Sequence, residues 1–405
     1  MIYKFDNFET PTHYRSWLLA LFFVLFCLFS PSLAASPAKQ LNDEQTNEIL
    51  FHIHAYYVDD LPLSDLSKSG LDELFAKLDP YSKYLNESEL EAVFSAASGH
   101  YTGLGIEVEE QPQGLIIINT LQGSPAALSG LQAGDKLIAI DGRNIAKESL
   151  QNVSALLRAA KLATIKLTVE RQLQQITLAL QRQAINIDSV TGRLLGNGIG
   201  YLAISSFNNH SYHDVARLIS MQQSEYGGAL RGLIIDLRDN PGGTLSSAVA
   251  IADLFLNSGT IVTTKGRFFD ANQAFTAQRG DILNGAPIAI MINGNSASAA
   301  EILAGALQDN RRALIMGTTS YGKGSVQSLI PIGDGNTALK LTTARYYTPS
   351  GQSIDGIGIK PDVLLEQEVL SQLSKAVIMN LALPDTTVEM ASMLAKLDPL
   401  ILSKQ

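Results

Sequence analysis

The sequence predicts a multidomain α/β protein. Its parts are a helical N-terminal region, a small domain of short strands with two helices, a larger α/β domain with a twisted sheet, and a helical C-terminal tail. Three observations support this prediction. The chain has 405 residues, too many for one ordinary core and suited to two or three domains. Its hydrophobic fraction of 46% and charged fraction of 17% are typical of globular proteins. The spacing of apolar residues also changes near residues 100 and 185.

Residues 1–34 have the pattern of a secretory signal peptide. Lys4 and Arg15 supply positive charge, and a charge-free apolar run of 13 residues follows from Trp17 to Phe29. Small residues at the −3 and −1 positions suit a cut after Ala34. A retained membrane anchor is the alternative, although a span needs about 20 apolar residues. We therefore expect export, with the periplasm as the destination.

Cysteine content and charge exclude several functional classes. The only cysteine, Cys27, lies inside the apolar run, so a processed chain has no thiol. Disulfides, thiol catalysis and cysteine metal sites are then excluded. The formal net charge of −9 argues against nucleic-acid binding. No residue cluster indicates a metal or organic cofactor. His210 and His213 could form a metal-binding pair, but the simpler interpretation is a solvated helix start.

Residues 36–99 are predicted to be helical, because apolar residues recur there at three- and four-residue spacing. The expected helices cover 41–57, 69–78 and 88–97. Residues 100–182 instead contain short strand-like runs between glycine, proline and aspartate turns. We expect strands at 105–108, 115–120, 136–140 and 164–170, and helices at 126–130 and 150–160. This order suits one compact domain.

Residues 185–365 alternate between strand and helix patterns, as an α/β domain does. Two runs, 230–237 and 287–292, are apolar on both faces, as buried parallel strands are. Further strands are expected at 200–205, 260–265 and 313–316, a strand pair at 324–331 and 338–344, and helices at 246–256 and 297–308. The remaining residues 366–405 are expected to form a helical tail.

A serine-containing turn follows the buried strand that ends at Ile292. Residues 293–301 combine a glycine turn, small residues and the start of a helix. A helix N-terminus presents unpaired amides and partial positive charge, which suit an oxyanion formed by attack on a carbonyl. The alternative is a plain helix cap with Ser296 as the N-cap residue.

Lys323 is a candidate base for such a serine. No histidine lies beside a serine turn made of small residues, and a neutral lysine can serve as the base instead. Its reference pKa of about 10.4 would have to fall to roughly 7–8 by loss of water. Gln327 lies four residues on, so in an extended strand it points to the same side and could hold the amine. An ordinary loop lysine is the alternative.

A double glycine follows the other buried strand. In residues 236–243, Gly242 and Gly243 can expose backbone N–H groups that bind an anion. The alternative is an ordinary strand-to-helix loop. None of the three elements is specific by itself, and their combination in one α/β domain carries the interpretation.

SASAAEILAGALQD followed by GTTSYGKGSVQ resembles the carboxyl-terminal processing peptidases, or tail-specific proteases. DLRDNPGG and TARYYTPSGQSIDGIGIKPDV resemble motifs of the same family, and the likeness extends from about Leu78 to Val363. The resemblance implies that Ser298, rather than Ser296, is the nucleophile of a serine endopeptidase. It also implies that Lys323 is the base.

The same resemblance implies three further site features. Gln327 supports the lysine, and the oxyanion donors are the amide of Ala299 and that of Gly242 or Gly243. Tyr81 stands in LDPYSKYL where family members often have histidine, a departure expected to affect only local packing.

Residues 100–182 resemble the PDZ domain that is inserted in this family. The run Gly103, Leu104, Gly105 and Ile106 matches the loop that binds a terminal carboxylate while the peptide adds as a strand. Leu104, Ile106, Val153 and Leu157 would form the apolar pocket, with plain core packing as the alternative. Arg171 is a candidate contact to substrate or to the catalytic domain, with an exposed strand-end arginine as the alternative.

The expected function is an exported serine endopeptidase whose PDZ domain captures apolar C-terminal tails of protein substrates and gates activity by shifting an equilibrium. An adaptor protein and oligomerisation are left open. The first alternative is a non-catalytic PDZ scaffold of the same fold. The second uses Ser320 and Lys323 as an S-x-x-K pair, which would require a helix across glycines 322 and 324.

Overall fold

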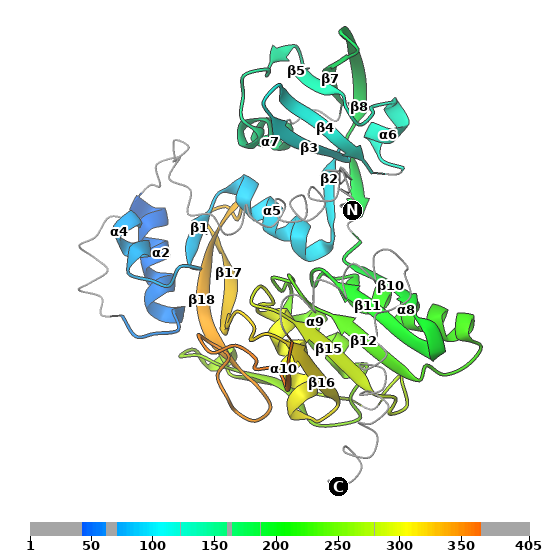
Figure 1. Cartoon of the computed structure of the whole chain (residues 1–405). Coiled ribbons are helices and arrows are strands. Elements are labelled where there is room, and N and C mark those ends of the chain that lie inside the picture. The colour runs from blue at the N-terminus through cyan, green and yellow to red at the C-terminus, as the bar shows by residue number, and fades with distance from the viewer. Residues whose placement is uncertain are drawn as a thin grey trace, which may run out of the picture. The chain divides into compact units, whose positions relative to one another are not determined.

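The computed structural model describes residues 43–61, 71–121, 123–159, 164–186, 188–278 and 280–365 (Figure 1). The predicted signal peptide (1–34) and C-terminal tail (366–405) lie outside the described residues. Within the described ranges, no helix is both long and apolar enough to cross a bilayer. No three potential metal ligands converge in those ranges either.

The N-terminal region contains the three predicted helices, α2 (Asp43–Tyr56), α4 (Leu71–Ala76) and α5 (Glu87–Ser98). Asn86 starts α5 through a capping box with Glu89, and Gly99 ends it at φ 78°. Between α4 and α5 lies an unpredicted strand, β1 (Lys83–Leu85). A strand of three residues is too short to show a period in the sequence.

The PDZ segment folds around a six-stranded sheet. Five strands follow the order β3-β4-β5-β7-β8, and β6 pairs with β5. Its strands are β3 (Ile106–Gln111), β4 (Gly114–Thr120), β5 (Lys136–Ile140), β6 (Arg143–Asn144), β7 (Thr164–Arg171) and β8 (Gln174–Gln181), and its helices are α6 (Pro125–Ser129) and α7 (Leu150–Ala159). The four predicted strands and both helices are confirmed. The hydrophobic core includes Ile117, Leu137 and Leu167, all without exposed surface.

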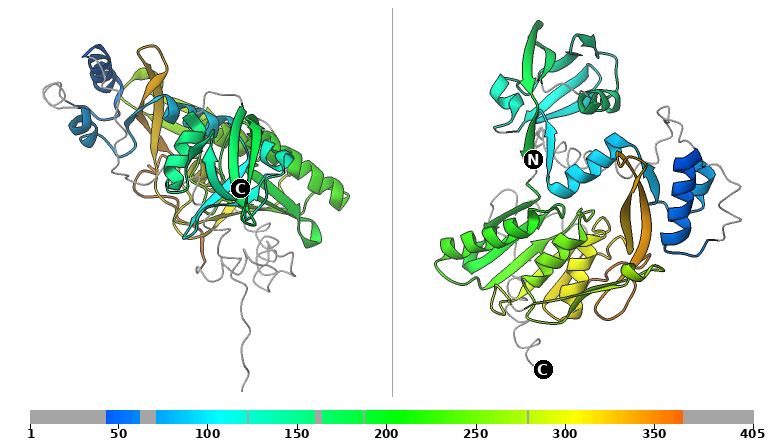
Figure 2. Two further views of the ribbon diagram at one scale, coloured as in Figure 1. Left: turned by 90° about the horizontal axis from the view of Figure 1, so that it is seen from above. Right: turned by 180° about the vertical axis from the view of Figure 1, so that it is seen from behind.

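A two-stranded ladder closes this segment. β2 (His100–Gly103) pairs antiparallel with β9 (Gln183–Asn186), so His100 lies opposite Asn186 and Gly103 opposite Gln183. The two ends of the PDZ segment therefore lie side by side, and the segment leaves and rejoins the chain at one place (Figure 2).

The larger domain contains a six-stranded sheet in the order β10-β11-β12-β15-β16-β19, parallel except for β10. Its strands are β10 (Val190–Leu194), β11 (Ile199–Ile204), β12 (Gly232–Asp236), β15 (Ile288–Ile292), β16 (Ala313–Gly317) and β19 (Val363–Leu364). Every residue of β12 and β15 is buried. Because these two strands are parallel neighbours, the loops that follow them leave the same edge of the sheet.

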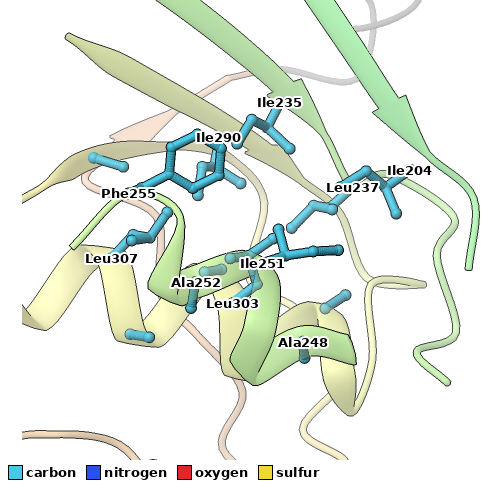
Figure 3. Close-up of a cluster of buried hydrophobic side chains, with 14 of the residues drawn as sticks. Ile204, Ile235, Leu237, Ala248, Ile251, Ala252, Phe255, Ile290, Leu303 and Leu307 are labelled. Carbon is cyan, nitrogen blue, oxygen red and sulfur yellow. The ribbon is translucent and has the colours of Figure 1, made fainter. Parts of the chain in front are cut away.

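Helices α9 (Leu245–Asp253) and α10 (Ala299–Asp309) bury their apolar side chains against this sheet, and α8 (Ser211–Tyr226) belongs to the same core. Figure 3 shows Ile251 of α9 and Leu303 of α10 packed with Ile235 and Ile290 of the strands. Burying one such side chain stabilises the fold by about 1.5–3 kcal/mol. This core fixes the start of α10 against the edge of the sheet.

The larger domain also contains a second sheet, so the prediction of a single twisted sheet is incomplete. Its order is β1-β18-β13-β14, with β17 also paired to β18. The strands are β13 (Thr260–Lys265), β14 (Gln273–Thr276), β17 (Ser325–Ile332) and β18 (Thr337–Tyr347). The β17–β18 hairpin, gold to orange in Figure 2, pairs with β1 and β13 rather than with the parallel sheet. Such non-local pairing leaves no mark in the period of the sequence.

Candidate active site

Two loops meet at the edge of the parallel sheet. The loop after β12 carries Asp239, whose Oδ1 accepts hydrogen bonds from the side-chain amides of Asn293 and Asn295 in the loop after β15, at 2.9 and 2.8 Å. The amide of Ala297 donates to the carbonyl of Asn240 at 2.9 Å. Asn240 has no exposed surface. These bonds hold the double-glycine loop against the serine turn.

Gly242 lies directly beside Ser298. A Cβ built on Gly242 would lie 2.8 Å from Ser298 Cβ and 2.9 Å from the amide nitrogen of Ala299, so only glycine fits. The amide of Gly242 donates to Asn240 Oδ1 at 2.8 Å. In contrast, the amides of Gly243 and Ala299 donate to no other group in the described part of the chain. One unused donor thus belongs to the residue after Ser298, and the other belongs to the residue after Gly242, which lies beside Ser298.

Ser298 occupies a strained turn between β15 and α10. Its backbone has φ 54° and ψ −113°, outside the regions open to most L-residues, and it is the N-cap of α10. Strain of this kind costs of the order of 1–3 kcal/mol and is typical of functional sites. The residue is 8% exposed.

The prediction that Ser296 caps the helix is wrong. Ser296 is fully buried, and its hydroxyl donates to the carbonyl of Leu237 at 2.8 Å while accepting from the amide of Asn293 at 2.9 Å. Its hydrogen bonds therefore join the loop after β12 to the loop after β15. The S-x-x-E spacing of Ser298 and Glu301 is the capping-box signal that indicates the correct helix start.

Glu301 is a buried carboxylate that joins the serine turn to the lysine loop. Its Oε2 accepts the amide of Ser298 at 2.7 Å and the amide of Lys323 at 2.8 Å. Its Oε1 accepts the amide of Gly322 and the hydroxyl of Ser320, both at 2.6 Å. The backbone amides of Ser298 and Lys323 thus donate to the same carboxylate oxygen. Their two nitrogens therefore lie within two hydrogen-bond lengths of each other. Sequence reasoning did not assign Glu301 a role.

Burial raises the pKa of the Glu301 carboxyl, and the four hydrogen bonds oppose that rise. Three of the four partners are backbone N–H groups, which can only donate. This arrangement matches an ionised carboxylate better than a neutral acid, whose proton would need an acceptor.

Lys323 is half-buried, and its pKa is lowered to about 8. Burial is the largest cause, and the positive charge of Lys340 adds to it, while Asp79 and Glu301 act in the opposite direction. The Lys323 Nζ lies 4.7 Å from the centroid of the Tyr81 ring. Among the described residues it donates no hydrogen bond, so the amine is not bonded to the Ser298 hydroxyl in this structure.

The expected hydrogen bond between Gln327 and the Lys323 amine is absent from the described contacts. The Gln327 Nε2 instead donates to Ser325 Oγ at 2.8 Å and to Thr342 Oγ1 at 3.3 Å. The reason is that β17 begins only at Ser325, so Lys323 lies before the strand and the alternation of sides on which the prediction depended does not reach it.

The S-x-x-K alternative is wrong. Residues 320–324 form no helix. The hydroxyl of Ser320 donates to Glu301 and accepts the amide of Ile359 at 2.6 Å. Ser320 is therefore held away from any role as a nucleophile that Lys323 could activate.

Two further polar side chains lie at the site and were not predicted. Tyr346 of β18 is buried, which raises its pKa to about 12, and a hydrogen-bonding interaction with Ser298 partly offsets that rise. Asp236, at the end of β12, accepts the hydroxyl of Tyr201 at 2.8 Å and forms an ion pair with Arg238. The contacts of Tyr346 with Ser298 and of Tyr201 with Asp236 join distant segments, which no local pattern reveals, whereas the Asp236–Arg238 pair is local.

The proposed PDZ loop has the backbone features of an anion-binding turn. The carbonyls of Leu104 and Gly105 accept the amides of Ala126 and Leu121, both at 2.9 Å. The amides of Leu104 and Gly105 donate to no group among the residues that the structure describes. Gly105 has φ 74°, and a Cβ there would lie 2.3 Å from Ser124 Cβ.

The other candidate PDZ residues lie in the domain core or in an ion pair. Leu104 and Val153 belong to the buried cluster, and Ile106 and Leu157 pack against it half-buried. Arg171 forms two hydrogen bonds to the buried Asp135, at 2.6 and 2.7 Å. Its guanidinium is thus engaged inside the PDZ segment.

Comparisons with known proteins test the predicted resemblance. A family model for peptidase family S41 matches residues 198–365, and one for the PDZ domain matches residues 117–171. The carboxy-terminal-processing protease of Bartonella bacilliformis is 38% identical over 359 residues, which cover 86% of this chain and 82% of that protein. The chain belongs to peptidase family S41.

Further relatives agree with this membership. The carboxyl-terminal-processing protease of a Synechocystis species is 36% identical over 312 residues, covering 75% of this chain and 72% of that protein. A solved photosystem II D1 C-terminal processing protease aligns at a TM-score of 0.52 with 28% identity, covering 82% of this chain and 95% of that one. The predicted family, fold class and enzyme class are confirmed. This S41 chain is a serine-type peptidase with a PDZ domain, and it acts on proteins or peptides.

Proposed function

We propose that the chain is an exported endopeptidase in which Ser298 is the nucleophile and Lys323 the general base. The observation that carries this proposal is the Glu301 carboxylate oxygen, which accepts the amides of both residues. A strained serine at a helix N-terminus and a lysine with lowered pKa are thereby held on one buried group. Neutral lysine is the form that accepts a proton from a hydroxyl.

In this mechanism the Ser298 hydroxyl attacks a backbone carbonyl and Lys323 accepts its proton. The protonated amine then gives the proton to the leaving amine, and water hydrolyses the acyl-enzyme. The amides of Ala299 and Gly243 are the preferred oxyanion donors, because the amide of Gly242 already donates to Asn240. Gln327 would support the lysine after leaving its hydrogen bonds to Ser325 and Thr342.

We further propose that the PDZ segment captures the apolar C-terminal tail of a protein substrate. Support comes from the two unused amides of Leu104 and Gly105, which suit a carboxylate, and from the half-buried Ile106 and Leu157, which suit an apolar side chain. Arg171 would stabilise this segment through Asp135. Export to the periplasm, which the signal pattern motivates, and gating by bound tails complete this proposal.

The test uses a fluorophosphonate probe, which labels an activated serine. We expect the wild-type chain to be labelled and to cleave a test protein with an apolar tail. Ser298→Ala should abolish both, and Lys323→Ala should reduce both by at least about 10³-fold, because the base is lost. Exposed Ser350→Ala and Lys360→Ala serve as matched controls and should behave as wild type. Retained cleavage in Ser298→Ala would refute the proposal, and absence of labelling in the wild type would favour the scaffold alternative.

A further inference from the structure

Tyr81, which lies between α4 and β1, places its ring against the lysine of the active site. The Lys323 Nζ is 4.7 Å from the ring centroid, the distance of a cation–π contact. That amine has no hydrogen bond to another described residue, Ser298 included. The ring of Tyr81 is therefore the specific partner of the amine in this conformation.

A turn of four residues holds Tyr81 in place. Asp79 Oδ1 accepts the amide of Tyr81 at 2.8 Å, and Asp79 Oδ2 accepts the hydroxyl of Ser82 at 2.6 Å. The ring is thus fixed by the hydrogen bonds of its own turn.

The same turn is connected to Gln327. Ser82 Oγ accepts the amide of Thr342 at 3.0 Å, and Thr342 Oγ1 accepts the Nε2 of Gln327 at 3.3 Å. Lys323 and Gln327, the two residues proposed to assist Ser298, are therefore both engaged by other groups. Tyr81 contacts the Lys323 amine directly, and Ser82 is linked to Gln327 through Thr342.

We propose that Tyr81 is a positioning residue, which holds the Lys323 amine on its ring in the resting enzyme, so that acylation begins when the amine moves from the ring to the Ser298 hydroxyl. This inference rests on the proposed Ser298–Lys323 chemistry. It assigns a role in catalysis to a residue of the N-terminal region, where only local packing was expected.

The ring favours the protonated amine, because the face of an aromatic ring is negative. The charged groups that act on the amine are Lys340 on β18, Glu301 on α10 and Asp79 in the turn of Tyr81 itself. The phenol also faces Tyr321 and Asp355. Replacing the ring by an aliphatic side chain leaves these groups in place, so the loss of the ring face should move the acid limb of the rate profile to lower pH.

The experiment compares Tyr81→Leu, which removes the ring face, with Tyr81→Phe, which retains it. The readout is the rate of fluorophosphonate labelling of Ser298 across pH, without peptide. We expect Tyr81→Leu to label about three- to tenfold faster, with its acid limb at lower pH, because the resting contact is lost. Tyr81→Phe should resemble wild type, as should the control Tyr84→Leu in neighbouring β1.

Three results would overturn the inference: an unchanged or slower rate in folded Tyr81→Leu, equal acceleration in Tyr81→Phe, or acceleration that persists when Lys323→Met is added. Labelling of Ser298→Ala would instead refute the proposed function itself. The two failures are therefore distinguishable.

A spectroscopic measurement keeps the test independent of variant folding. In wild-type protein with ¹³C-labelled lysine, we expect one ε-methylene signal shifted upfield by the ring current of Tyr81 and absent from Lys323→Arg. It should move to an ordinary position when a peptide aldehyde occupies Ser298. A free enzyme without such a shifted signal would refute the contact.

Discussion

Lys340 lies on β18 opposite Lys83 of β1, and its positive charge is the second cause of the lowered Lys323 pKa. Because the base must be neutral, activity should rise as pH increases through about 8. Lys340→Gln removes the neighbouring charge, so the Lys323 pKa should increase. We expect the acid limb of kcat/KM to move to higher pH by up to about one pH unit.

The control for this variant is Lys265→Gln, which removes a lysine of β13 that lies over the Tyr347 ring instead. Its profile should match wild type. A Lys340→Gln profile that stays in place, or moves to lower pH, would show that this charge does not tune the base.

At the residue scale, the motifs were sufficient to predict Ser298, Lys323 and the two glycines as neighbours. The hydrogen bonds of Glu301 and the ring contact of Tyr81 were not predictable, because each joins segments far apart in the chain. Ser298 and Glu301 did carry a local signal, the S-x-x-E capping box, which also indicates the helix start correctly. The roles of all these residues stay predictions.

The start of α10 is the element on which the site depends, and Glu301 is its key side chain. Glu301→Gln replaces one acceptor oxygen by an NH₂ group that faces backbone N–H donors. We expect the free energy of unfolding to fall by about 2–4 kcal/mol, because buried donors lose their partner. Labelling of Ser298 should fall at least about tenfold, since the serine and lysine loops lose their common anchor.

Urea unfolding and probe labelling measure the two effects. Glu225→Gln, exposed near the end of α8, is the matched control and should change neither. Wild-type labelling in Glu301→Gln would mean that the carboxylate does not organise the site.

At the element scale, most helices and strands agree with the prediction to within a few residues, because their apolar periods are strong. β8 is an exception: Ile176, Leu178 and Leu180 alternate as in a strand, yet the run was not assigned. The two-residue strand β19 carries no period. The division into two sheets and the start of β17 after Lys323 depend on pairing partners, which single-chain patterns do not encode.

At the scale of the whole molecule, the β2–β9 ladder allows the PDZ segment to be removed. Replacing residues 104–182 by Asn-Gly should convert the ladder into a two-residue hairpin and leave the protease domain folded. We expect small-probe labelling within a few-fold of wild type. Cleavage of a test protein should lose its dependence on an apolar tail, seen as a KM at least about tenfold higher.

The matched comparison is the same pair of chains on a test protein with a charged tail, for which KM should not differ. Unchanged preference for apolar tails after removal would refute capture by this segment. The order of the regions along the chain was predictable from composition and period. The signal peptide, the periplasmic destination and the C-terminal tail lie outside the described residues and stay predictions.

The left-handed backbone of Ser298 has an evolutionary consequence. Glycine adopts φ 54° without a steric penalty, so a Ser298→Gly descendant would relieve of the order of 1–3 kcal/mol of strain while losing its hydroxyl. The same change would remove the capping side chain at the start of α10, which offsets part of that relief. We therefore expect serine to be kept at this position by the reaction of its hydroxyl and not by the stability of the fold.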